Sequence, residues 1–186
     1  MTVFRSSILF TFLLSVINLS LSLGQEVEWQ SFEKAMQENT SAQKMIFIDV
    51  YTDWCGYCKK MDKMTFKDPK VSSVLNEKFM PIKFNAEQKE PINFNGNEFK
   101  FVANGRRGYH ELAAALLGGR LSYPTVVLAS HDFDVLLPIA GFRQKEEMHM
   151  LLSFFSSHAD QKDVFSSQET FDKKLTEFRE TYKSPY

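Results

Sequence analysis

Apolar and polar residues recur along the chain with two periods, and each change of period predicts a new element. Within residues 26–43 apolar side chains stand three and four positions apart (Trp29, Phe32 and Met36 among them), which predicts a first helix. The run "KMIFIDVYT" that follows is short, apolar and rich in β-branched and aromatic residues, so it predicts a buried strand.

The same two patterns continue toward the C-terminus. Further strands are predicted for three apolar runs: "MPIKFNAE", "YPTVVLAS" and "DVLLPIAG". Further helices are predicted for four amphipathic segments: "CKKMDKMTF", "KDPKVSSVLNEKF", "YHELAAALLGG" and "RQKEEMHMLLSFFSSHA". Asp68 and Pro69 are typical of an N-cap and a first helical residue, and Gly118 with Gly119 is typical of a helix end. The order of elements predicts an α/β fold with a central sheet flanked by helices.

Two segments extend this plan. Residues 90–106 predict an inserted β-hairpin, because apolar residues alternate on both sides of the turn pair Asn95-Gly96. The following "ANGRRG" is predicted to be a loop. Residues 161–186 predict a helical extension, in which the apolar residues form one stripe: Phe171, Leu175, Phe178 and Tyr182.

The first 24 residues have a different character. Arg5 precedes an uncharged apolar run that ends in Ser22-Leu23-Gly24, with small residues at the −3 and −1 positions of a cleavage site. This pattern is typical of a secretory signal peptide, so we expect residues 1–24 to be removed and residues 25–186 to form one domain. The alternative is an uncleaved membrane anchor, although the apolar part is shorter than the roughly 20 residues of a spanning helix. We therefore expect a periplasmic protein, with secretion as the alternative, and no membrane insertion after cleavage.

Charge and composition reduce the number of function classes that the chain could have. The 22 Lys and Arg residues nearly balance the 23 Asp and Glu residues, so no basic surface for nucleic acid is expected. The chain has only 2 cysteines, Cys55 and Cys58. A disulfide that closes so short a loop restricts the unfolded chain very little, which makes a stabilising cross-link a poor explanation. Redox chemistry and metal binding remain as interpretations.

The position of the cysteines favours redox chemistry. A predicted strand runs directly into "WCGYC" and a helix follows, so Cys55 lies at the N-terminus of that helix. Unpaired backbone N–H groups and the helix dipole favour an anion there, which makes Cys55 the attacking thiolate. Cys58 lies one turn inside the helix and would resolve a mixed disulfide. Lys59 and Lys60 add positive charge, with a modest effect because they are solvated.

These residues give the chain a resemblance to the thioredoxin family, in its exported bacterial branch. "WCGYC" is similar to the Trp-Cys-Gly-x-Cys motif of the family, and "YPTVV" is similar to its cis-proline loop. Three single residues match the positions of a buried acid, a neighbouring lysine and a glycine after the last strand pair: Asp49, Lys83 and Gly141. The resemblance covers residues 28–157 and implies a thioredoxin-like mixed sheet.

The resemblance also implies a set of roles. Asp49, buried behind the cysteines, would have a raised pKa and take the proton of Cys58, and Lys83 would moderate that shift. A cis peptide before Pro124 would bring the Tyr123 backbone near the sulfurs, where it could pair with a substrate strand. The substrate-binding surface would include three residues of the motif: Trp54, Gly56 and Tyr57. The implied protein is a monomeric thiol–disulfide oxidoreductase without cofactor or metal, acting on client proteins and on an upstream redox partner.

Several alternatives stay open. The layout favours a reductase over an oxidase or isomerase, although "CGYC" also resembles the active site of disulfide isomerases. A second class is a dithiol protein that binds or delivers Cu(I), which would need a further Met or His ligand. Met61 and Met64 are predicted to face the core, and the four histidines (His110, His131, His149 and His158) have no ligand spacing with the cysteines. A partner-binding module without turnover is disfavoured by the intact motif residues. The hairpin could line the site, select a partner or only extend the sheet.

Overall fold

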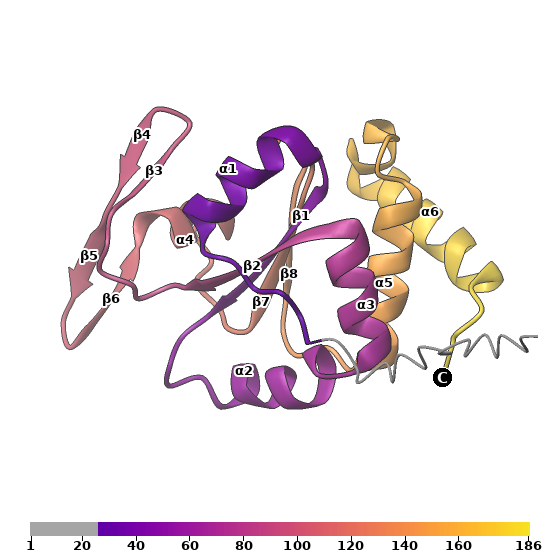
Figure 1. Cartoon of the computed structure of the whole chain (residues 1–186), viewed down its shortest axis with the longest axis horizontal. Coiled ribbons are helices and arrows are strands. Elements are labelled where there is room, and N and C mark those ends of the chain that lie inside the picture. Colours follow the sequence, from indigo (N-terminus) through magenta and orange to yellow (C-terminus); the bar gives the residue numbers. More distant parts are fainter. Residues whose placement is uncertain (1–25) are drawn as a thin grey trace, which may run out of the picture.

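A mixed sheet of four strands forms the centre of the protein (Figure 1). The computed structural model describes residues 26–186, so the expected signal peptide lies outside the described residues. The strand order is β2-β1-β7-β8, with bounds Phe79–Asn85, Met45–Tyr51, Thr125–Ala129 and Leu136–Ala140. β1 runs parallel to β2 and antiparallel to β7, which is antiparallel to β8. The predicted α/β architecture with a mixed sheet is therefore confirmed.

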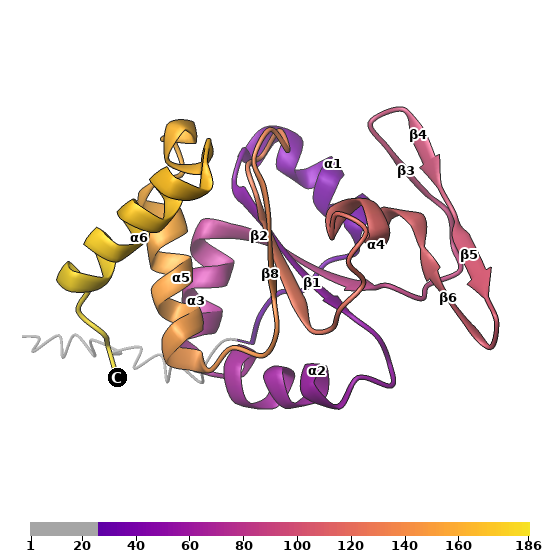
Figure 2. The same cartoon turned by 180° about the vertical axis from the view of Figure 1, so that it is seen from behind.

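Helices cover both faces of this sheet (Figures 1 and 2). One face carries α1 and α4, with bounds Phe32–Ala42 and Glu111–Leu116. The other face carries α3 and α5, with bounds Pro69–Lys78 and Lys145–Ser157. The C-terminal helix α6, Gln168–Thr181, follows the short 3-10 helix Lys162–Phe165 and packs outside α5. None of the helices in the described part of the chain combines the length and apolar character needed to cross a membrane.

The alternation of β1 divides the core into two layers. Ile46, Ile48 and Val50 belong to the apolar cluster under α1 and α4. Phe47 belongs to the cluster under α3 and α5, on the opposite face. Because successive residues of a strand point to opposite faces, Asp49 points to the same side as Phe47. This face also holds Met61, from the helix that follows the cysteines.

Two hairpins extend the fold at the end opposite α6 (Figure 1). The predicted hairpin is present as β3 and β4, Ile92–Phe94 and Asn97–Phe99, with Asn95 and Gly96 in the left-handed conformation of its turn. The prediction of a loop at "ANGRRG" was wrong. These residues belong to a second hairpin, formed by β5 and β6, Phe101–Asn104 and Arg107–His110.

Two predicted helices begin later than expected. Helix α1 begins at Phe32 and not at residue 26, because Ser31 is its N-cap and Gln30 already pairs with β2 through two backbone hydrogen bonds of 3.0 and 3.1 Å. Trp29 therefore lies before the helix that its spacing predicted. Helix α4 begins at Glu111, because the two preceding residues complete β6 and the His110 ring caps the helix.

The helix after the cysteines also differs in part from its prediction. Helix α2, Gly56–Met61, continues as a π-helical segment, Asp62–Phe66. The wider π turn changes which side chains share a face. Met61 is fully buried as predicted, whereas Met64 is 52% exposed, so its predicted place in the core was wrong. The start of α3 is confirmed, with Asp68 as N-cap and Pro69 as first residue.

Candidate active site

Cys55 and Cys58 form a disulfide at the junction between β1 and α2. Cys55 is the N-cap of α2, and its sulfur accepts a hydrogen bond from the backbone N–H of Cys58 at 3.0 Å. Both cysteines are largely covered, with 5% and 2% of their surface exposed. Cys55, the slightly less covered residue of the two, is therefore also the one whose sulfur receives the N–H donor of the helix.

The loop before β7 lies at the same edge of the sheet. The Tyr123–Pro124 peptide bond is cis, as the motif predicts. The next residue, Thr125, pairs with Val50 at the end of β1, from which the chain continues into the cysteine motif. The N–H of Gly141, a residue with φ of 96°, donates to the carbonyl of Pro124 at 2.8 Å and ties the end of β8 to this loop.

Asp49 lies buried in the core, near the end of β1. Its side chain is 1% exposed, and burial raises its pKa from 3.8 to about 6, although the nearby Lys83 ammonium opposes that change. Lys83 pairs with Asp49 in the strand register and donates to Oδ2 at 2.5 Å. Within the described chain, Oδ1 of Asp49 is buried and has no hydrogen-bond partner. This oxygen is thus free to receive a proton.

Lys83 contacts a second carboxylate that the sequence did not indicate. It also donates to Asp62, which lies one turn after Cys58 on the same helix. Burial opposes the charge of Lys83, but the two carboxylates raise its pKa above the ordinary value. Three aromatic rings surround the ammonium at 5.0 to 5.5 Å: Trp29, Tyr51 and Phe66. The sequence signal that could have indicated Asp62 was its i, i+4 spacing from Cys58.

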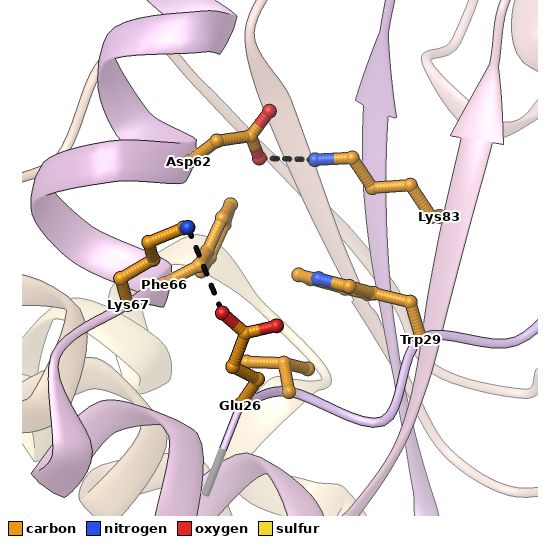
Figure 3. Close-up of a pocket in the computed structure, with 7 residues that line it drawn as sticks. Glu26, Trp29, Asp62, Phe66, Lys67 and Lys83 are labelled. Atoms are coloured by element: carbon orange, nitrogen blue, oxygen red, sulfur yellow. Dashed lines mark hydrogen bonds and ion pairs between the residues drawn. The ribbon is translucent and has the colours of Figure 1, made fainter. Parts of the chain in front are cut away.

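A pocket connects Lys83 and Asp62 to solvent. It has a volume of about 250 Å³ and includes Asp62, Lys83 and Trp29 in its lining. Figure 3 shows the Lys83 ammonium pointing to Asp62, with the Lys67–Glu26 ion pair nearby in the same pocket. Asp62 is 39% exposed and Lys83 is 21% exposed, whereas Asp49 is covered. The three groups therefore lead from a buried carboxylate to an accessible one.

Two aromatic residues of the cysteine motif, Trp54 and Tyr57, lie on the outer surface. Trp54 is 50% exposed and contacts Tyr123 edge to face, with ring centres 6.0 Å apart. Tyr57 is 64% exposed and lies 6.3 Å from the ring of Phe142. A Cβ atom added to Gly56 would meet no other atom within 4 Å, so this position leaves the surface open. The structure therefore brings the predicted surface residues of the motif and the cis-proline loop together.

A comparison with protein families identifies the family of this chain. A family model named Thioredox_DsbH, with the description "Protein of unknown function, DUF255", matches residues 17–168. The chain belongs to this family. The predicted membership of the wider thioredoxin-like group is thereby confirmed, and the Cys55–Cys58 disulfide is the CXXC centre of this DsbH-family protein.

Other proteins resemble the chain over shorter segments or at the level of the fold. The chain is 41% identical over 58 residues to the thiol:disulfide interchange protein DsbD of Photorhabdus laumondii, a match that spans 31% of this chain but only 10% of that protein. A thioredoxin from Thermus thermophilus has the same fold, with a TM-score of 0.55, 17% identity and coverage of 75% and 94% of the two chains. A structure described as DsbH oxidoreductase gives a TM-score of 0.51 at 14% identity, covering 74% of this chain and 88% of that one.

The arrangement in this DsbH-family protein is that of a thiol–disulfide oxidoreductase. A disulfide lies in a CXXC motif at a helix N-terminus, beside a cis-proline loop, and the strand that leads into the motif carries a buried acid. Among residues 26–186 there is no group of three or more His, Cys, Asp or Glu side chains that could hold a metal ion. Met64 is exposed and Met61 is buried in the core.

Proposed function

We propose that the protein is an exported reductase that transfers electrons from its Cys55–Cys58 dithiol to disulfides of client proteins. The free, buried Oδ1 of Asp49 supports this most directly, because a carboxyl with a pKa of about 6 accepts a proton near neutral pH. A reductase needs such a base at the step in which Cys58 attacks.

The proposed cycle has two exchanges. The Cys55 thiolate attacks one sulfur of the client disulfide, so a Cys55–client bond forms and the other client sulfur leaves as a thiolate. Cys58 then loses its proton to Asp49 and attacks Cys55, which closes the Cys55–Cys58 bond and releases the first client sulfur as a thiolate. The client gains two electrons and the protein loses two. A dithiol partner upstream must return them, because the cycle ends in the disulfide form.

The surroundings of Cys55 support reduction over oxidation. A strongly oxidising pair requires a reduced form in which several groups stabilise the thiolate. Within the described residues, one backbone N–H donates to the Cys55 sulfur, and Lys59 and Lys60 are exposed. Solvated lysines stabilise a neighbouring anion only weakly. We therefore infer a potential near the thioredoxin end of the range.

The reduction potential tests this direction. The mature protein is equilibrated in dithiothreitol and glutathione buffers, and the fraction of free Cys55 and Cys58 is measured by thiol alkylation. We expect a potential of about −270 mV, as for a reductase. A potential of about −120 mV would instead identify an oxidant or isomerase, and the absence of a reversible couple would favour dithiol metal binding.

Export is a separate part of the proposal. It rests on the pattern of residues 1–24 and places the mature protein in the periplasm, beginning at Gln25. Expression of the full chain in a Gram-negative host, followed by fractionation and N-terminal sequencing, checks both points. Recovery of the uncleaved chain in the membrane fraction would support the membrane-anchor alternative.

A further inference from the structure

The second hairpin forms one wall of a groove beside the disulfide. The groove has a volume of about 410 Å³ and lies between β5–β6, the loop before Pro124 and Trp54. Its charged and aromatic lining consists of Trp54, Glu87, Arg107, Tyr109 and Tyr123. Trp54 directly precedes Cys55, and Tyr123 directly precedes the cis proline. The groove is therefore continuous with the surface that a client must contact.

Arg107 connects the hairpin to the cysteine motif. Its guanidinium carbon lies 4.1 Å from the centre of the Trp54 ring, which itself contacts Tyr123. A guanidinium stacked on a ring keeps its N–H groups in its own plane, where they remain available to a carboxylate. Among residues 26–186, no carboxylate forms an ion pair with Arg107. The hairpin thus holds an unpaired cation next to the residue that precedes the attacking cysteine.

Glu87 lies in the same groove as Arg107. Within the described residues, its side chain also lacks an ion pair. Burial raises the pKa of Tyr123, and the negative charge of Glu87 adds to that rise. An occupant of the groove therefore meets a cation from the hairpin and an anion from the segment after β2. Such a groove discriminates between occupants by the sign of their charge.

We propose that this groove binds the client segment next to its reacting cysteine and that Arg107 selects clients with an acidic residue there. The proposal rests on the proposed function, because the mixed disulfide with Cys55 delivers the client chain to the groove. An extended chain advances about 3.3 Å per residue, so a residue one or two positions from the client cysteine reaches the ring of Trp54. Its carboxylate would receive hydrogen bonds from the in-plane N–H groups of Arg107.

Matched peptides test the selection. Three disulfide-bonded peptides differ only at the residue after one cysteine, which is Glu, Gln or Lys, and the reduced protein is mixed with each. We expect the second-order rate constant of this single turnover for the Glu peptide to exceed that for the Lys peptide by about tenfold at low salt, and the ratio to fall as salt is added. Arg107→Gln should bring the ratio to one or below, because Glu87 remains in the groove and disfavours the Glu peptide.

Two further variants make the test specific. Arg106 directly precedes Arg107 in the same hairpin and does not line the groove, so Arg106→Gln should keep the full ratio and is the matched control for charge. Glu87→Gln removes the opposing anion and should increase the preference for the Glu peptide. A wild-type ratio near one, or an equal loss in the Arg106 and Arg107 variants, overturns the proposal.

The failure of this inference is distinguishable from failure of the proposed function. A small uncharged disulfide, such as hydroxyethyl disulfide, reports dithiol chemistry without using the groove. If the protein reduces this compound and all three peptides at equal rates, the redox function holds and the selection by Arg107 is wrong. If it reduces none of them, the proposed function itself is wrong.

Discussion

Lys83 donates one hydrogen bond to Asp49 and another to Asp62, so a single ammonium joins a fully buried carboxylate to one at the surface. The two carboxylates come from different elements, β1 and the π-helical segment after α2. Because the ammonium opposes the rise in the pKa of Asp49 and the Asp62 carboxylate adds to it, changes at the two positions have opposite effects.

Lys83→Met and Asp62→Asn should therefore shift the pKa of Asp49 in opposite directions. Loss of the ammonium removes its attraction for the ionised form, so the pKa should rise above about 6. Without the Asp62 charge, the Lys83 ammonium interacts with the Asp49 carboxylate alone, so the pKa of Asp49 should fall. The pKa is measured from the carboxyl carbon signal of Asp49 in an NMR titration of each variant. Shifts of the same sign in both would contradict the arrangement.

Asp49→Asn should slow the resolving step without blocking the first attack. The amide cannot accept the Cys58 proton, and a positioned general base contributes about 100-fold or more. Reduced protein is mixed with a client disulfide, and the mixed disulfide is followed by acid quenching and mass spectrometry. We expect it to persist about 100 times longer than in the wild type near pH 7, while Cys55 attacks at an unchanged rate. Equal lifetimes would exclude Asp49 as the base.

Ionisation of Asp49 should also make stability depend on pH. Its pKa is about 6 in the folded protein and 3.8 ordinarily, so the folded state binds more protons between these values. The free energy of unfolding should therefore decrease as pH rises from about 4 to 6, by about 3 kcal/mol for this group alone. Asp49→Asn cannot ionise, so its stability relative to the wild type should increase over the same window. Urea unfolding of the oxidised proteins measures this difference, and parallel pH profiles would contradict it.

The parts of the fold that depend on local chemistry could be predicted from the sequence. The Asn95-Gly96 turn and the start of α3 at Asp68-Pro69 follow from the conformations that these residues prefer. The second hairpin did not follow in this way, because its pairing depends on a non-local fit. Gly108 lies against Phe101, and a Cβ there would come within 2.1 Å of that ring.

The site residues likewise differ in whether the local sequence could predict them. The cysteines, Asp49 and Pro124 lie within or beside recognisable motifs, and the strand register then places Lys83 opposite Asp49. Asp62 contacts Lys83 only because β2 lies beside the helix that carries it, and Arg107 reaches Trp54 only through the position of the hairpin. Contacts between distant parts of the chain had no local signal beyond the spacing of Asp62 from Cys58.

The two cysteines should have separable roles. Cys58→Ser leaves the attacking thiolate but removes the resolving thiol, so mixed disulfides between Cys55 and clients should accumulate. Cys55→Ser should abolish turnover and trap nothing, because Cys58 is 2% exposed. The variants are expressed in cells, alkylated and compared on non-reducing gels, with the double variant as control. If Cys55→Ser trapped clients to the same extent as Cys58→Ser, the assignment of Cys55 as the attacking and Cys58 as the resolving cysteine would be wrong.

Gly108→Ala should loosen the second hairpin while leaving the central sheet intact. Its Cβ would lie 2.1 Å from Phe101 Cζ and 2.3 Å from the carbonyl oxygen of Val102, so the strands must separate or the ring must move. Overpacking of this kind costs about 2 kcal/mol. Because a local opening accelerates amide exchange, we expect faster hydrogen exchange in residues 101–110 and unchanged exchange in β1.

The matched control is Gly56→Ala, whose Cβ would meet no atom within 4 Å and should leave exchange in the hairpin unchanged. A loosened hairpin no longer holds Arg107 on Trp54, so Gly108→Ala should also reduce the preference for the Glu peptide while the reduction of hydroxyethyl disulfide continues. If exchange in residues 101–110 stays at the wild-type rate, the close contact with Phe101 does not determine the hairpin. If exchange rises but the preference persists, Arg107 does not need the hairpin to reach the client.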